Sequence, residues 1–209
     1  AQQHYIDTLD SSGKNLMLLI DYLLDLSKIE SGKLELDIEP FKTFSWITDI
    51  QNIAEPLFEN KKAIFITELG KELPDYLEGD ATRLLQITIN FISTAAKATE
   101  EGELKLTVGG QLISDNQFNL HIAIEDTGQG IADEKLELIF EAFHQLEADR
   151  ISNKGVGLGL AICKRLSDIM KGRLQVTSSL GQGSRFGFDV VLTVPDKTLC
   201  LDEAEKKID

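Results

Sequence analysis

Two glycine-rich segments constrain the fold of this chain more than any other part of its sequence. The first, Glu125–Ile131, reads Glu-Asp-Thr-Gly-Gln-Gly-Ile and follows an alternating polar and apolar run over 120–125. Such alternation predicts a β-strand, which would end at Asp126, and the glycines would then let the backbone turn tightly. The second segment, Gly155–Ala161, places three alternate glycines before an apolar-periodic stretch typical of a helix. The sequence therefore predicts a mixed α/β domain.

The residue types of these two segments fit the two ends of a nucleotide. A carboxylate such as Asp126 accepts hydrogen bonds and suits the exocyclic amine of a purine. Bare amide groups at a helix start, together with the positive end of the helix dipole, favour a phosphate group. Taken singly, a glycine pair more often marks an ordinary turn than a ligand site. Together the segments predict a pocket with one end for a base and the other for phosphates.

Charge and composition exclude other classes of function. The 209-residue chain carries 21 basic and 35 acidic residues, and this net charge of −14 disfavours nucleic acid or an anionic membrane as a partner. The two cysteines, Cys163 and Cys200, form no metal-binding or disulfide pattern. No apolar run approaches membrane-spanning length. We therefore expect a protein of the reducing, intracellular environment.

Four motifs in a fixed order make the chain resemble a known family. They are Asp126–Gly130, Phe140–Phe143, Gly155–Gly159 and Gly181–Phe186. In this order they resemble the first glycine box, the phenylalanine box, and the second and third glycine boxes of the ATP-binding catalytic domain of sensor histidine kinases. The resemblance implies a two-layer α/β sandwich of the Bergerat type, which Hsp90-, gyrase- and MutL-like ATPases share.

The N-terminal thirty residues give the strongest helical pattern. Apolar or small residues recur at intervals of three and four, at Ile6, Leu9, Gly13, Leu16, Ile20 and Leu23. Residues 23–34 resemble the end of the second helix of the kinase dimerisation domain, which implies a four-helix bundle made by two chains. The alternative is an amphipathic helix packed on its own domain. We expect three parts: residues 1–32 in the bundle, 33–195 as the catalytic domain, and 196–209 as a charged linker or tail.

The three histidines do not fit the family's phosphoacceptor pattern. In the family, an acidic residue and then a proline follow the phosphorylated histidine. His4, His121 and His144 lack these neighbours, so we interpret all three as ordinary surface or rim residues. The helix that would carry the acceptor precedes residue 1, and we expect this chain alone to be unable to phosphorylate itself at histidine.

A helix beginning after Asp80 is expected to form one wall of the pocket. Asp80 is a suitable N-cap, and the apolar face comprises Leu84, Ile87, Phe91, Ala95 and Ala98. Beside it runs a polar stripe of Gln86, Asn90, Thr94 and Lys97. Such a stripe is usually a solvated face, but its place before the glycine-rich segments favours a lining of the nucleotide cleft.

This helix resembles the family's asparagine box, with one departure. The box has two asparagines four residues apart and a lysine three further on; Asn90 and Lys97 match, but Thr94 replaces the second asparagine. The resemblance implies that these first two positions meet the magnesium ion on ATP. A threonine hydroxyl can ligate magnesium, although it is shorter than asparagine. Related ATPases have a water-activating glutamate where Asn90 stands, and asparagine cannot act as a general base.

The remaining pattern predicts the other elements. We expect strands over 33–41, stopping at Pro40, and over 63–68, 103–109, 118–125, 173–178 and 186–194. We also expect a loop over 70–79, turns over 109–119 and a short helix over 133–140. A further helix is expected from Thr43 or Ser45 to about Asn60, with an inward face of Ile47, Ile50, Ile53, Ala54 and Leu57. Residues 144–154 resemble the family's lid, from which Arg150 and Lys154 could reach phosphates; a merely solvated loop is the alternative. Val156 stands where the family more often has threonine.

The resemblance implies a set of ATP-binding residues. They are Asn90, Thr94, Lys97, Asp126, Gly128, Gly130, Ile131, Phe143, Arg150, Lys154, Gly155, Val156, Gly157, Leu158, Gly159 and Leu160, with Asn90 and Thr94 also meeting magnesium.

The function implied is transfer of the γ-phosphoryl group of ATP to a histidine outside this chain, for relay to an aspartate of a response-regulator receiver domain. The implied location is the cytoplasmic side of a sensor attached to the inner membrane, and the similarity to hybrid kinases indicates a receiver domain downstream. The alternative is a degenerate module, weak in using magnesium and ATP, that acts by dimerising or by docking on other kinases.

Overall fold

The alternating segments of the sequence form a seven-stranded sheet. The computed structural model describes residues 13, 17, 20, 23–25, 27–29, 31–142 and 157–196. The strands are β1 (Glu39–Lys42), β2 (Lys62–Leu69), β3 (Tyr76–Gly79), β4 (Glu101–Ser114), β5 (Gln117–Asp126), β6 (Arg173–Ser179) and β7 (Gly183–Thr193). Their order is β1-β3-β7-β5-β4-β2, and β6 pairs with β7 beside this path. The β2–β4 pair is parallel and the other pairs are antiparallel.

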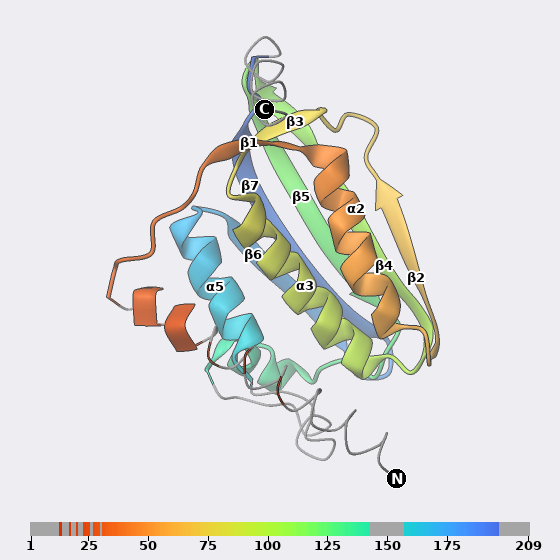
Figure 1. The fold of residues 1–209 in the computed structure, drawn as a ribbon. Coiled ribbons are helices and arrows are strands. Elements are labelled where there is room, and N and C mark those ends of the chain that lie inside the picture. Colours follow the sequence, from red (N-terminus) through yellow and green to blue (C-terminus); the bar gives the residue numbers. More distant parts are fainter. Residues whose placement is uncertain are drawn as a thin grey trace.

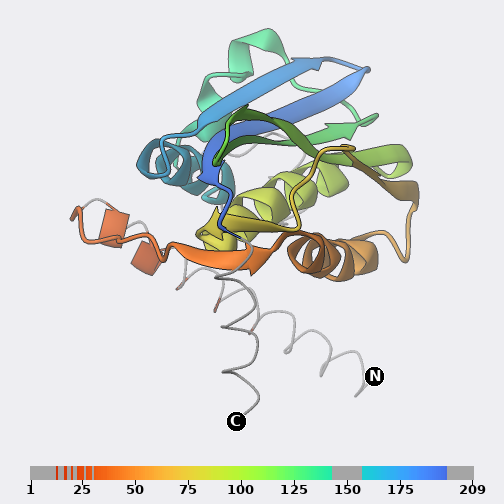
Figure 2. The same ribbon diagram turned by 90° about the horizontal axis from the view of Figure 1, so that it is seen from above.

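Three helices cover one face of the sheet and make the second layer (Figures 1 and 2). They are α2 (Thr43–Ala54), α3 (Ala81–Ala98) and α5 (Gly159–Ile169), and α3 lies between the other two (Figure 1). Phe91 of α3 stacks on Phe186 of β7 with ring centroids 5.5 Å apart, and both rings are buried. Burying one such ring contributes about 2–3 kcal/mol. The expected two-layer α/β sandwich is therefore confirmed.

Polar side chains cover the other face of the sheet. His121 of β5 contacts the Asp189 carboxylate of β7 through Nδ1 at 2.7 Å, and Arg185 Nη2 lies 3.0 Å from the histidine Nε2. Arg185 also pairs with Glu125, which Lys105 of β4 approaches to 3.5 Å. The histidine that the sequence places on the surface is thus half-buried in a network of charged groups.

Helix α3 is fixed at both ends by charged side chains. At its start, Asp80 Oδ1 accepts a hydrogen bond from the Arg83 amide at 2.9 Å, which confirms the expected N-cap. The other oxygen, Oδ2, accepts from the Asp37 amide at 3.0 Å. At its end, Lys61 Nζ donates to the carbonyls of Ala96 at 2.5 Å and Thr99 at 3.1 Å. A cation there adds a donor to the last carbonyls of the helix and complements the helix dipole.

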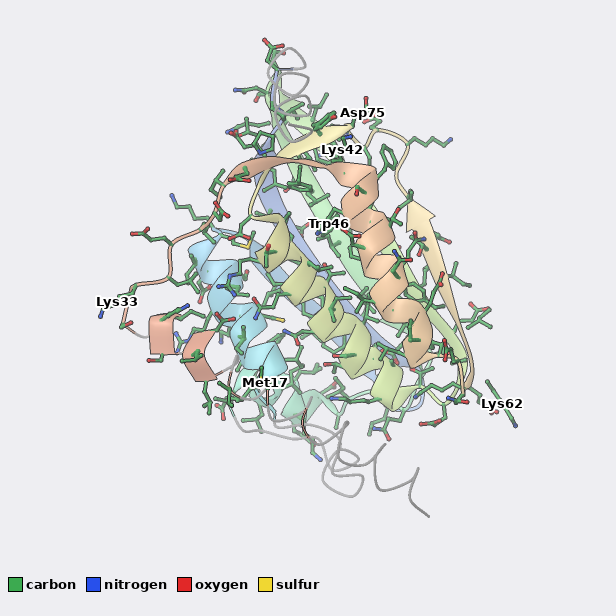
Figure 3. All side chains as sticks on the ribbon, in the orientation of Figure 1. Met17, Lys33, Lys42, Trp46, Lys62 and Asp75 are labelled. Atoms are coloured by element: carbon green, nitrogen blue, oxygen red, sulfur yellow. The ribbon has the colours of Figure 1, made fainter. Side chains whose placement is uncertain are left out.

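Helix α2 also packs against this helix. Trp46 Nε1 donates to the Ala81 carbonyl at 3.2 Å, and Figure 3 shows the indole on the side of α2 that faces α3. The helix ends at Ala54 and not at Asn60, because Pro56 lacks an amide hydrogen and falls in the 3₁₀ turn η1 (Glu55–Leu57). Ile53 and Leu57 are exposed, contrary to the expected inward orientation.

The start of α2 and three other elements also differ from the sequence-based expectation. Neither Thr43 nor Ser45 caps α2, since its N-cap position is Lys42 and makes no side-chain bond. Tyr76–Gly79, expected as part of a loop, forms β3, whose four residues pair with β1 and whose Glu78 pairs with Thr193 of β7. The strands β4 and β5 extend almost to each other, so the expected turn-rich stretch is mostly a hairpin. Residues 133–140 form two 3₁₀ turns, η2 (Asp133–Lys135) and η3 (Leu138–Phe140), because their bonds close over three residues.

The N-terminal residues that the structure describes are helical as far as Ile29. The helix ends at Gly32, whose φ of +64° allows the Lys33 amide to bond the Lys28 carbonyl at 2.9 Å. This is a Schellman ending, which needs a left-handed residue. Leu23 and Leu24 of this helix are exposed.

A polar clasp joins the N-terminal helix to the first turns of α3. The Asp25 carboxylate oxygen Oδ2 accepts hydrogen bonds from Arg83 Nη1 and Gln86 Nε2, both at 2.8 Å. Gln86 Oε1 in turn accepts from the same Arg83 nitrogen at 2.7 Å. Gln86, which the sequence analysis placed along the cleft, therefore binds the N-terminal helix. The clasp links the position of that helix to the helix that carries Asn90.

We expect a measurable coupling between Asp25 and Arg83. Both side chains are mostly buried, at 14% and 20% exposure, so their charge-assisted bond is little screened by water. A double-mutant cycle with D25A and R83A, read by urea unfolding, should give about 1 kcal/mol of coupling. The more exposed Lys105–Glu68 pair, 3.6 Å apart, is the control and should give about 0–0.5 kcal/mol. Equal couplings in the two cycles would contradict a clasp.

Candidate functional site

A pocket lies between the last turns of α3 and the end of β5. Its walls come from α3, from β5, from the loop that follows β5, and from β7. The lining residues are Thr94, Ala95, Lys97, Ala98, Asp126, Gln129, Gly130, Ile131, Ser184 and Phe186. The pocket thus joins the end of the polar stripe to the first glycine-rich segment, as the sequence predicts.

Asp126 is the buried acceptor of this pocket. Its side chain is 5% exposed, and Oδ1 accepts hydrogen bonds from the Gly128 amide at 2.8 Å and the Thr99 hydroxyl at 3.5 Å. The other oxygen, Oδ2, is buried and has no hydrogen-bond partner among the residues that the structure describes. Burial raises the pKa of this carboxyl above its ordinary value, although nearby donors, first the Gly128 amide, lower it in part.

The glycines around Asp126 serve the packing of the protein itself. A Cβ on Gly128 would lie 2.5 Å from the Ala98 carbonyl oxygen of α3. Gly130 and Gly183 have positive φ, and a Cβ on either would strike a backbone carbonyl, that of Ser179 or of Asp126. The sequence-based set of ATP-binding residues includes Gly128 and Gly130. In the structure the space beside them is filled by backbone, which brings the loop, α3 and the β6–β7 turn together.

The polar stripe of α3 divides into two environments. Thr94 and Lys97 line the pocket, and Lys97 is exposed. The Thr94 hydroxyl donates to the Asn90 carbonyl at 2.7 Å, so its proton is used while its lone pairs remain available. Asn90, one turn earlier, is buried, and its Oδ1 lies 2.9 Å from where a Cβ of Gly159 would stand. Gly159 therefore allows α5 to pack closely against Asn90.

The start of α5 lies beside Asn90, and its N-cap residue Leu158 makes no side-chain cap hydrogen bond among the described residues. Gly157, with φ of +72°, turns the chain before Leu158, and α5 begins at Gly159 without a side-chain cap. Leu158 is buried and Leu160 is half-buried against the core, so both contribute backbone and not side chain to this end. The backbone amides of a helix's first turn, together with the helix dipole, favour anions. This geometry fits the expected phosphate end.

Several predicted site residues fall outside the described part of the chain. Phe143, Arg150, Lys154, Gly155 and Val156 belong to this group, so their predicted roles stay predictions.

Two side chains that bond Asp126, Thr99 and Ser184, are not among the site residues predicted from the sequence. Thr99 follows the asparagine-box pattern directly, and Ser184 lies within the third glycine box, so their place in these motifs was the available signal.

The side-chain chemistry of Asn90 and Thr94 suits a magnesium ion. Both offer neutral oxygen atoms one helical turn apart, which is the ligand type that magnesium prefers. Among the described residues there is no group of three or more His, Cys, Asp or Glu that could hold a metal ion. The pair therefore fits a magnesium ion that arrives already coordinated by phosphate oxygens.

Comparison with protein families gives one match over most of the catalytic region. Residues 79–197 match the family described as histidine kinase-, DNA gyrase B- and HSP90-like ATPase. The matched range begins just before α3 and includes Asp126, all of α5 and β7.

Curated relatives are sensor kinases that are longer than this chain. The sensor protein GacS of Pseudomonas syringae pv. syringae is 35% identical over 91% of this chain and 21% of the relative. The aerobic respiration control sensor protein ArcB homolog of Haemophilus influenzae is 37% identical over 81% of this chain and 50% of the relative. Hybrid signal transduction histidine kinase L of Dictyostelium discoideum is 33% identical over 88% of this chain and 11% of the relative. The chain thus spans half or less of each.

Solved structures with this fold come from the same group of proteins. Full-length ShkA in complex with AMPPNP superposes with a TM-score of 0.76 at 31% identity, over 93% of this chain and 40% of ShkA. The nucleotide-free catalytic domain of histidine kinase ThkA gives a TM-score of 0.61 at 25% identity, over 74% of this chain and 95% of that domain.

The close contact of Gly183 with Asp126 predicts a difference between two glycines of one turn. Both Gly181 and Gly183 have positive φ, so alanine strains the backbone at each by about 1 kcal/mol. Nothing lies within 4 Å of a Cβ at Gly181, whereas one at Gly183 would overlap the Asp126 carbonyl. We expect urea unfolding to show a loss of about 1 kcal/mol for G181A and about 3 kcal/mol or more for G183A. Equal losses would show that β7 can move away from Asp126.

Proposed function

Because this chain belongs to the histidine kinase-, DNA gyrase B- and HSP90-like ATPase family, as the ATP-binding catalytic domain of a sensor histidine kinase, we propose that it binds ATP between Asp126 and the start of α5. We further propose that it passes the γ-phosphoryl group to a histidine outside this chain, for relay to a receiver-domain aspartate. The names of the relatives support kinase activity, and the AMPPNP in ShkA supports ATP as the nucleotide.

The observation that carries this proposal is the buried Oδ2 of Asp126 without a partner in the described chain. A buried acceptor left unpaired costs about 1–3 kcal/mol, more when it is charged. The exocyclic amine of adenine would supply the missing donor and recover this cost on binding. Phe186, Ile131 and Ala95 provide apolar walls for a flat base.

The phosphate end is supported by the geometry around Asn90. The uncapped amides of α5 lie against Asn90, and Lys97 is a cation at the mouth of the pocket. Arg150 and Lys154 would add further positive charge from the proposed lid. In this proposal Asn90 and Thr94 meet a magnesium ion that bridges the phosphates. The ion neutralises charge on the transferred group, while the chain positions the nucleotide.

Transfer to another side chain is favoured over hydrolysis. Asn90 stands where related ATPases carry a glutamate, and an amide cannot remove a proton from water. We propose that the acceptor histidine is presented by a dimeric bundle to which residues 1–32 contribute. The exposed Leu23 and Leu24 support a partner on this helix. In this proposal the chain alone does not phosphorylate itself at histidine. The relatives support a cytoplasmic place for the domain; among the described helices none could cross a membrane.

The degenerate-module hypothesis finds no support in the comparisons, since the relatives are kinases. Titration of ATP with and without magnesium separates the two hypotheses. Tight binding that ignores the metal would favour the degenerate module.

The raised pKa of Asp126 predicts a conflict between stability and binding. A carboxyl with a raised pKa in the fold contributes stability below its ordinary pKa, and this contribution is lost as the pH rises through the raised value. At neutral pH the carboxylate therefore destabilises the empty domain. We expect D126N to raise the Tm of the empty protein at pH 7, with the gain vanishing at acid pH.

The same substitution should weaken ATP binding about 100-fold in calorimetry, because an amide nitrogen replaces an acceptor of a charged hydrogen bond. The matched control is D189N, a half-buried aspartate on the other face of the sheet, which should leave ATP affinity unchanged. An ATP affinity that is unchanged in D126N would contradict the proposed binding site.

The proposed role of Thr94 predicts that a substitution at this position changes the magnesium-dependent affinity for ATP. Asparagine is longer than threonine and offers a carbonyl oxygen, so T94N should bind ATP about three- to tenfold more tightly with magnesium and no more tightly in EDTA. The control is S93N on the adjacent face of α3, where Ser93 bonds the Asn90 carbonyl at 3.1 Å; it should show no such gain. If T94N gains equally in EDTA, the position does not meet the metal.

A further inference from the structure

Three acceptors at the end of α3 surround the side-chain ammonium group of Lys61, which lies in the turn between η1 and β2. Its Nζ donates to the carbonyl oxygens of Ala96 at 2.5 Å and Thr99 at 3.1 Å, and to Glu100 Oε1 at 3.3 Å. An ammonium group has three hydrogens to donate, and here each of them has a partner. Only 17% of the side chain is exposed, whereas a lysine usually keeps its charge in water. Lys61 is therefore held against α3, although it belongs to another part of the chain.

The backbone on both sides of Lys61 is fixed as well. The Lys61 amide donates to the Phe58 carbonyl at 2.9 Å, which closes the turn. The Phe58 ring stacks on Phe65 of β2 with ring centroids 5.6 Å apart. The Lys62 amide donates to the Glu100 carbonyl at 3.1 Å, where β2 begins to pair with β4. Because the ammonium projects from an anchored turn, it can hold the end of α3 in place.

The two carbonyls that Lys61 binds enclose a stretch of the pocket wall. Ala96 and Thr99 flank Lys97 and Ala98, both of which line the pocket, whereas Lys61 itself does not. Lys61 therefore supports this wall from behind.

The same stretch of α3 contacts the loop that follows β5. The Ala98 carbonyl oxygen accepts a hydrogen bond from the Gln129 amide at 3.4 Å and lies 2.5 Å from where a Cβ of Gly128 would stand. The Thr99 hydroxyl lies 3.5 Å from Asp126 Oδ1. The position of the acceptor at the base end, relative to the wall opposite, therefore depends on the end of α3 staying in place.

We propose that Lys61 is a positioning residue for the base end of the pocket: it holds the last turn of α3 so that Asp126 meets the purine amino group in one fixed geometry. This inference rests on the proposed ATP site. The proposed phosphate end, at Asn90, lies about two helical turns earlier and packs against α5, so it does not depend on Lys61.

The test compares ATP with purine riboside triphosphate, which lacks the exocyclic amine, by calorimetry on the whole chain. Wild type should bind ATP at least about tenfold more tightly than this analogue. K61M keeps a long side chain but loses the three donors. Its affinity for ATP should fall about five- to tenfold, while its affinity for the analogue falls less than about twofold. K61R keeps a cation with several donors and should restore most of the preference.

The matched control is K62M, which removes the same charge from the next residue. Lys62 is exposed, and Figure 3 shows its side chain pointing away from the domain, so K62M should leave the preference unchanged. A second control is E100Q, which weakens only the contact to a side chain that is 75% exposed and leaves both carbonyl contacts. It should also leave the preference unchanged.

Should K61M not fold, K61Q removes the charge with a shorter side chain and should show the same loss of preference. Equal weakening of both nucleotides, or a lower Tm with the preference intact, would overturn the role of Lys61 and leave the ATP site standing. Wild type that binds both nucleotides equally, or neither of them, would overturn the proposed ATP site and this inference with it.

Discussion

The structure depends on a carboxylate that is buried while one of its oxygens has no partner among the described residues. Burying such a group costs free energy, and the surroundings of Asp126 hold it in place. The Gly128 amide bonds one oxygen, Gly183 packs against the Asp126 backbone, and Ser178 ties the following loop to the next hairpin. Because the fold bears this cost in the empty state, a ligand that donates to the free oxygen gains affinity from it. The Asp126 carboxylate therefore lowers the stability of the empty domain while it favours the binding of a donor ligand.

Helix α3 connects this carboxylate to the rest of the molecule. Its N-terminal turns hold Asp25 of the preceding helix through Arg83 and Gln86, and Lys61 caps its C-terminal carbonyls. Between these ends lie Asn90 against α5 and Thr94 in the pocket. One rigid element thus joins the N-terminal helix, the proposed phosphate end and the proposed base end. A change in the position of the N-terminal helix would therefore shift α3 and, with it, Asn90 and Thr94.

Much of the fold could be predicted from local sequence patterns. Strand alternation placed β2, β5 and β7, and Asp80 was recognised as the cap of α3, because these signals depend on neighbouring residues. The four-residue strand β3 was missed, since its identity comes from pairing with β1 and β7. Residues 133–140 were expected as one helix, because an apolar period of three to four fits both a helix and successive 3₁₀ turns.

The sequence by itself determined the family, the sandwich and the residue types at both ends of the pocket, because motif order and periodicity lie along the chain. It could not determine which atoms these residues contact. Only the tertiary structure decided that Gln86 binds Asp25, that Gly128 and Gly130 make room for backbone, and that Ser178 joins Ile131 to Gly183. The physical reason is that hydrogen-bond direction and steric fit depend on atoms from segments far apart in sequence, which meet only when the sheet and its helices have packed.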